Sequence, residues 1–87
     1  MRKKIEIYMH TIISDCRTTD DVDDRKTCDK VIARLHDIVK NVKKGDLKKV
    51  IKSYIGTLKI RIKDVNTNSE YRFYHEVIAK LEKISKK

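Results

Sequence analysis

The chain of 87 residues has no proline and only two glycines, and aromatic residues make up only 6% of it. Tight β-hairpins and the corners of β-sandwiches use these residue types, so their scarcity argues against a fold built from strands. Apolar residues nevertheless reach 39% and recur in ordered patterns, which argues against a disordered chain. We therefore predict one all-α domain over residues 1–87, long enough for a single modest core.

Long apolar runs and a cysteine framework are also missing. The chain has neither an apolar leader segment nor a long uncharged stretch, so we expect neither secretion nor membrane insertion. Its two cysteines, Cys16 and Cys28, fall on apolar helical positions and lack a CxxC element. We expect them to be buried thiols in a reducing compartment, not zinc ligands or a redox pair. The opening letters MRKK are compatible with a domain excised from a longer protein.

Apolar residues recur at the i, i+3, i+4, i+7 spacing of one helix face in four segments. The first segment covers residues 5–16 and the second covers residues 28–42. Residues 17–27 lack this periodicity, and we predict a loop there. The side chains able to cap the next helix are Thr19, Asp20 and Asp21.

The third segment, from Leu47 to Val65, contains the alternating stretch LKIRIK, which resembles a half-buried strand. A helix accounts for eight apolar positions of the segment, whereas a strand accounts for three, so we predict a helix. Ile60 points away from its apolar face, either as a contact residue or because a short distortion buries it. Gly45 is expected to end the preceding helix and Asp46 to cap this one.

The fourth segment follows the polar run NTNS at residues 66–69, which we predict to be a loop with capping side chains. Its apolar positions are Tyr71, Tyr74, Val77, Ile78, Leu81 and Ile84. Four amphipathic helices joined by short connections are expected to pack as hairpins around one core.

Charge is unevenly distributed along the chain, whose formal net charge is +9. Residues 40–63 carry nine basic side chains against Asp46 alone, while residues 15–29 carry six aspartates against three basic side chains. The basic segment is either a solvated helix surface or a docking surface for an acidic partner. Nucleic acid is one candidate partner, but arginine is sparse there and no aromatic residue is interleaved to stack bases.

Reactive side chains do not form a known catalytic constellation, and we predict a protein that is not an enzyme and needs no cofactor. His10 and His36 each follow an apolar stripe residue, which is typical of a helix flank and not of a ligand. The aspartate run at residues 20–24 lacks the glycine and the terminal glutamate of a calcium-binding EF-hand, so we predict no metal site.

Three stretches of the chain, CDKVIARLHDI, LKKVIKSYIGTLKIRIK and YHEVIAKLEKISKK, resemble the TFIIS N-terminal domain family. The IG pair followed by a basic IRIK-like helix end is the most specific local match, and IEIYMHTIISDC with its acidic loop is most similar to the LEDGF-type integrase-binding domain. The resemblance implies a compact right-handed bundle of helical hairpins with four long helices and a short one, for which NVKKGDLKKV is the candidate.

The resemblance also implies a peptide-binding site on two interhelical loops. An aspartate of the first loop accepts backbone hydrogen bonds from the partner in such domains, and Asp21 corresponds to it, with Asp20 or Asp23 if the register shifts. Val22 is the one apolar residue near it. On the second loop the family has a phenylalanine and a valine. The corresponding residues here are Asp64, Val65 and Asn66. The basic helix end corresponds to Lys59, Arg61 and Lys63, with Ile60 as a further contact residue.

The function that the resemblance implies is non-enzymatic docking in a nuclear transcription or chromatin protein. The partners are short, acidic, disordered motifs that carry phenylalanine, bound by a monomer, with weak non-specific nucleic-acid contact in the parent protein. Apolar anchors in a groove and acids steered by a positive surface fit this mode of binding physically. The alternatives are a basic nucleic-acid-binding domain and a four-helix bundle like those of bacteriocin-immunity proteins.

Overall fold

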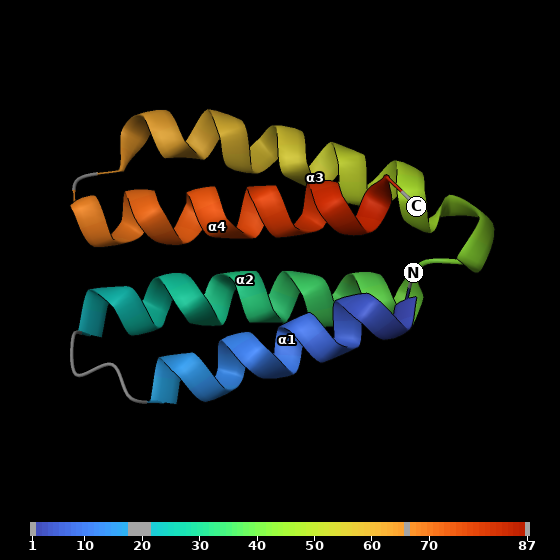
Figure 1. The fold of residues 1–87 in the computed structure, drawn as a ribbon, viewed down its shortest axis with the longest axis horizontal. Coiled ribbons are helices and arrows are strands. Elements are labelled where there is room, and N and C mark those ends of the chain that lie inside the picture. The colour runs from blue at the N-terminus through green and yellow to red at the C-terminus, as the bar shows by residue number, and fades with distance from the viewer. Residues whose placement is uncertain (1, 18–21, 66, 87) are drawn as a thin grey trace.

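Four long helices pack as two antiparallel hairpins in the computed structural model, which describes residues 2–17, 22–65 and 67–86 (Figure 1). The helices are α1 (Arg2–Arg17), α2 (Val22–Asn41), α3 (Leu47–Arg61) and α4 (Asn68–Ser85). Two short 3-10 helices, η1 (Lys44–Asp46) and η2 (Ile62–Asp64), precede and follow α3. The described residues contain no strand, so the predicted all-α bundle is confirmed.

One hydrophobic core lies between the two hairpins and takes side chains from every long helix. Its most deeply buried members are Ile5, Val31, Leu35, Ile38, Leu47, Ile51, Leu58, Val77 and Leu81. These residues lie on the predicted apolar stripes, because helical spacing places them on one face of each helix. Tyr71 is an exception, since 47% of it is exposed, while Phe73 packs against the core instead.

Helix α3 is regular through the alternating stretch and ends at Arg61, so the helical interpretation of residues 53–61 is confirmed. Ile60 is 67% exposed, which rules out a distortion that buries it. The chain then tightens into η2 and becomes extended at Val65. The third helix is therefore shorter than predicted, because its last apolar positions, Ile62 and Val65, meet the core from a 3-10 turn and an extended residue.

The loop predicted over residues 17–27 is wrong for most of its length, because α2 begins at Val22. Asp24 lies in the first turn of that helix, where negative charge is favourable next to the positive end of the helix dipole. Aspartates are typical both of a capping loop and of the first turn of a helix, so the sequence pattern alone did not distinguish the two. The proposed caps Thr19, Asp20 and Asp21 lie outside the described residues.

The connection between α2 and α3 contains the short helical element expected in NVKKGDLKKV, namely η1. Helix α2 ends at Asn41, and Gly45 lies inside η1 without a positive φ angle, so the prediction that Gly45 ends this helix is wrong. Asp46 makes no side-chain capping hydrogen bond. Capping is confirmed at α4, where the Thr67 hydroxyl accepts a hydrogen bond of 3.2 Å from the Glu70 amide.

The two ends of the bundle hold different parts of the chain. The α1–α2 and α3–α4 connections lie at one end, here called the loop end, and both termini and η1 lie at the other (Figure 1). The bundle measures 37 × 25 × 19 Å, with its helices along the longest direction. In the described part of the chain, no helix combines the length and the apolar character needed to cross a membrane.

Candidate functional site

A groove between α2 and α3 reaches the loop end of the bundle and has a volume of about 740 Å³. Tyr54 of α3 and Tyr74 of α4, each only 6% exposed, form its apolar base with half-buried Val65. Tyr54 and Tyr74 are thus core residues that also line the groove. The base is therefore a surface that can contact another apolar or aromatic side chain.

Charged side chains surround this apolar base and are evenly divided between the two signs. The cations are Lys30 and Arg34 of α2 and Arg61 of α3, and the carboxylates are Asp37 of α2, Asp64 of η2 and Glu70 of α4. Lys30, Arg34 and Asp37 share one face of α2 because they follow the i, i+4, i+7 spacing. Both donors and acceptors of charge-assisted hydrogen bonds are thus available along the groove.

Tyr54 is a neutral hydrogen-bonding group of this groove. Burial raises the pKa of Tyr54 to about 12, while the positive charge of Arg61 acts in the opposite direction. The phenol therefore keeps its proton at neutral pH, and its hydroxyl can donate a hydrogen bond to a ligand.

The predicted residues of the second loop divide into two groups. Arg61, Asp64 and Val65 line the groove, so the structure brings these three together. Lys59 instead forms an ion pair with Glu82 of α4 at 3.3 Å and does not line the groove. Ile60 and Lys63 are exposed but also lie outside the groove lining.

The predicted residues of the first loop are mostly beyond what the structure describes. Asp20 and Asp21 lie outside the described residues, as do Asn66 of the second loop and the side chain of Asp23. Val22 opens α2 and is 64% exposed at the loop end. Sequence analysis missed the contributions of α2 and of Glu70, although the regular spacing of Lys30, Arg34 and Asp37 was a usable signal.

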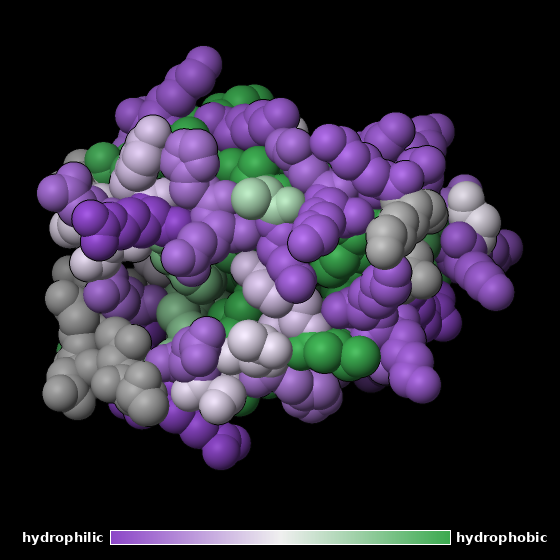
Figure 2. Space-filling view, in the orientation of Figure 1, coloured by the Kyte–Doolittle hydropathy of each residue, from purple (hydrophilic) through white to green (hydrophobic). Residues whose placement is uncertain are grey.

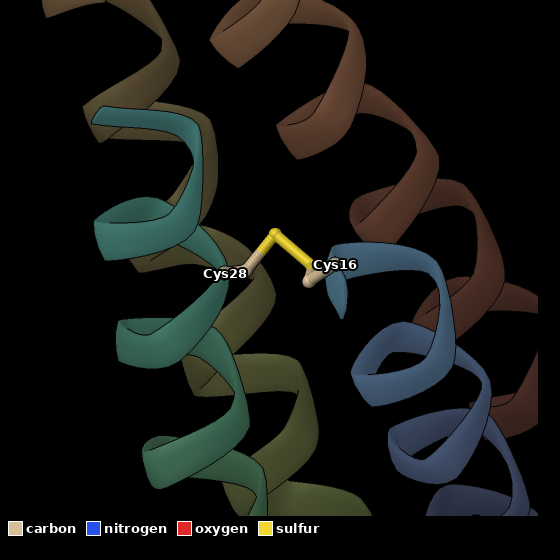
Figure 3. Close-up of a disulfide and its surroundings, with 2 residues drawn as sticks. All are labelled: Cys16 and Cys28. Atoms are coloured by element: carbon tan, nitrogen blue, oxygen red, sulfur yellow. A yellow bond between two sulfur atoms is a disulfide. The ribbon is translucent and has the colours of Figure 1, made fainter. Parts of the chain in front are cut away.

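A disulfide joins Cys16 in the last turn of α1 to Cys28 in α2 (Figure 3). The prediction of two buried thiols is therefore wrong. Because α2 starts at Val22, the chain reverses within a short connection, and the two Cα atoms come within 6.4 Å. This distance lies in the usual range for a disulfide.

A second, smaller hollow of about 240 Å³ lies beside the disulfide, where α1, α2 and α4 meet. Tyr8 and Phe73 provide its aromatic wall, and its acidic side chains are Asp15, Asp24, Glu70 and Glu76. Burial raises the pKa of Tyr8 to about 12, and the negative charges of Glu76 and Asp15 contribute to the rise. Glu70 lines both hollows, so the first turn of α4 separates them.

Histidines and potential metal ligands do not converge in the described part of the molecule. His10 and His36 are exposed, which confirms that they flank the apolar stripes. His75 is also exposed, and its Nε2 atom lies 3.2 Å from the Tyr71 hydroxyl. Among the described residues, no three side chains of histidine, cysteine, aspartate or glutamate are grouped closely enough to hold a metal ion.

No family model, curated protein or solved structure matches this chain. Membership of the TFIIS N-terminal domain family therefore stays a prediction, carried by the quoted stretches of sequence.

Proposed function

We propose that this domain is a non-enzymatic docking module that binds a short disordered peptide in the groove between α2 and α3. The observation that carries the proposal is the groove itself, in which Tyr54, Tyr74 and Val65 form an apolar base among charges of both signs. A peptide segment needs such an arrangement, because a few apolar anchors supply affinity while polar groups set its register.

The chemistry of the groove suits a peptide that carries both phenylalanine and acidic residues. A phenylalanine ring stacks or packs against the two tyrosines, and flanking carboxylates reach Arg34 and Arg61. Asp64 and Glu70 can accept hydrogen bonds from peptide backbone amides. This assigns to Asp64 the type of contact that the family resemblance implies for Asp21 of the other loop.

The affinity of such a module is expected to be modest. Burial of one or two phenylalanine side chains contributes about 1.5 to 3 kcal/mol each, and ordering the peptide opposes binding. A dissociation constant on the order of micromolar follows, which suits a reversible adaptor.

The cellular setting of the module follows less directly from its chemistry. The resemblance implies a nuclear transcription or chromatin protein, whereas the disulfide favours an oxidising compartment. Docking in the groove requires neither setting, because none of its lining residues belongs to the disulfide.

The test is an NMR titration of backbone amides with an acidic peptide that contains phenylalanine. We expect shifts concentrated on α2 residues 30–37, on residues 54–65 and at the start of α4. Arg61→Gln is expected to weaken binding at least about fivefold, because a charge-assisted hydrogen bond is lost. Lys59→Gln is the matched control, since Lys59 is two residues away and does not line the groove.

Two results would overturn the proposal. One is equal weakening by the Arg61 and Lys59 variants, which would mean that overall charge and not the groove governs binding. The other is a set of shifts centred on the terminal end of the bundle, far from the groove.

A further inference from the structure

Three segments that are distant in sequence meet at the end of the bundle that carries the termini (Figure 1). They are the first turn of α1, the connection from α2 to α3, and the last turn of α4. We call this surface the basic end. It consists of Arg2, Lys3, Lys4, Lys40, Lys43, Lys44, Lys48, Lys49, Lys83 and Lys86. The same end is densely covered by hydrophilic side chains in the space-filling view (Figure 2).

Two of these segments are in direct contact at the basic end. The Arg2 guanidinium donates a hydrogen bond to the Val42 carbonyl oxygen, which ties the start of α1 to the connection after α2. A hollow of about 410 Å³ lies beside this contact. The side chains that line it are Arg2, Lys3, Lys44 and Lys48, together with the core residue Leu47. Cations from two separate segments thus surround one concave site.

The positive charge of the basic end is largely uncompensated. Asp46 is the one carboxylate within residues 2–4, 40–49 and 83–86. Glu82, in the last turn of α4, forms an ion pair with Lys59, which lies outside the basic end. Clustered like charges repel and destabilise the compact state, so this arrangement has a cost that a bound polyanion would offset.

The composition of the basic end distinguishes between polyanions. Its segments contain no aromatic residue, and none of the large exposed apolar side chains, Ile7, Val22, Ile60 and Tyr71, belongs to it. A surface that inserts into a membrane needs such apolar or aromatic groups, and single-stranded nucleic acid is usually gripped by aromatic stacking. Lysines act as point charges for phosphates, which suits the backbone of a duplex.

We propose that the basic end binds the phosphate backbone of double-stranded nucleic acid without reading its sequence. The end of the bundle is about 25 Å wide. Because a duplex carries one charge for about every 1.7 Å of its axis, this width corresponds to roughly 15 phosphates on its two strands. The phosphates on one side of the duplex face the protein. This surface is separate from the peptide groove, so the two proposals stand or fall independently.

The test is fluorescence anisotropy of the full chain with a labelled 20-base-pair duplex between 50 and 200 mM salt. The basic-end variant combines Lys3→Gln, Lys44→Gln and Lys48→Gln. The control variant combines Arg25→Gln, Lys26→Gln and Lys63→Gln at the loop end, which removes the same charge from exposed positions. Circular dichroism checks that both variants keep the helical fold.

We expect the basic-end variant to lose about tenfold or more in affinity and to reduce the slope of log affinity against log salt by about 2 to 3. The control is expected to lose much less, and scrambling the duplex sequence is expected to leave the affinity unchanged. Equal losses by both variants would overturn the proposal. So would tighter binding to a single strand of equal length, or to phosphatidylserine vesicles at the same salt concentration, since each would indicate a different ligand.

Discussion

The loop end and the basic end of this bundle are built from the same four helices but differ in charge, in crosslinking and in exposed apolar surface. The loop end holds the disulfide, the carboxylates of Asp15 and Asp24 beside it, and exposed Val22. The basic end holds ten cations against one carboxylate and no large exposed apolar side chain. The two ends can differ in this way because, apart from the two cysteines, the residues that distinguish them lie on the surface and do not form the core.

Removal of the disulfide is expected to have the largest effect on stability, and to affect the loop end more than the basic end. Combining Cys16→Ser with Cys28→Ser is expected to lower the free energy of unfolding by about 3 kcal/mol, because the crosslink limits the freedom of the unfolded chain. Urea denaturation measures the loss. Hydrogen exchange should speed up mainly where α1 meets α2 at the loop end and much less at the basic end.

A reductant provides the control for this prediction. The wild-type chain in dithiothreitol should lose the same stability as the double variant, and the double variant should not respond. If dithiothreitol leaves the wild-type denaturation curve unchanged, the two thiols are not paired in solution.

Alkaline pH is expected to destabilise the protein through Tyr8 and Tyr54, which are at least partly buried and line the two hollows. Both pKa values are raised to about 12 in the folded state from about 10, so the folded protein holds these protons more tightly than the unfolded chain. Their contribution is fully present below pH 10 and is lost as the pH rises from 10 to 12.

Tyr54→Phe separates this contribution from the deprotonation of the many lysines. In the wild type, the free energy of unfolding should fall across the window from pH 10 to 12, by on the order of 1 kcal/mol per tyrosine because solvent screens the partly exposed phenols. The decline should be shallower in the variant, as measured by urea denaturation at several pH values. Identical declines in the two proteins would contradict the assigned pKa of Tyr54.

Helix capping gives the smallest effect and again contrasts the two ends. Thr67→Ala at the loop end removes the hydrogen bond to the Glu70 amide and is expected to cost about 1 kcal/mol. Asp46→Ala at the basic end is expected to cost much less, because Asp46 makes no capping hydrogen bond. Thermal unfolding of both variants measures the difference, and a larger loss for Asp46→Ala would reverse the assignment.

Local patterns predicted the helices well and their ends less well. The apolar stripe of α3 outweighed the alternating pattern at Leu58, Ile60 and Ile62, because eight positions fitted a helix. The start of α2 was misplaced, since the aspartates before Cys28 suit a loop and a helical first turn equally. The disulfide was missed for a different reason, because Cys16 and Cys28 fall on apolar helical positions without a CxxC element, and such positions suit buried thiols equally well.

The candidate site could be predicted only in part. Arg61, Asp64 and Val65 were identified from the second loop, and the structure places all three at the groove. Tyr54 lies on the apolar stripe of the third segment, but its position at the groove base depends on how α3 lies against α2. Lys30 and Arg34 were missed for the same reason, because a polar stripe on one helix does not indicate which helix it faces.

The sequence by itself determined four amphipathic helices, one core and an unequal distribution of charge along the chain. Each of these follows from the spacing of residues within a single segment. The tertiary structure alone decided that Cys16 meets Cys28, that α2 and α3 enclose a groove, and that residues 2–4, 40–49 and 83–86 share one end. These juxtapositions depend on the direction and packing of the two hairpins, which side-chain periodicity within a helix does not encode.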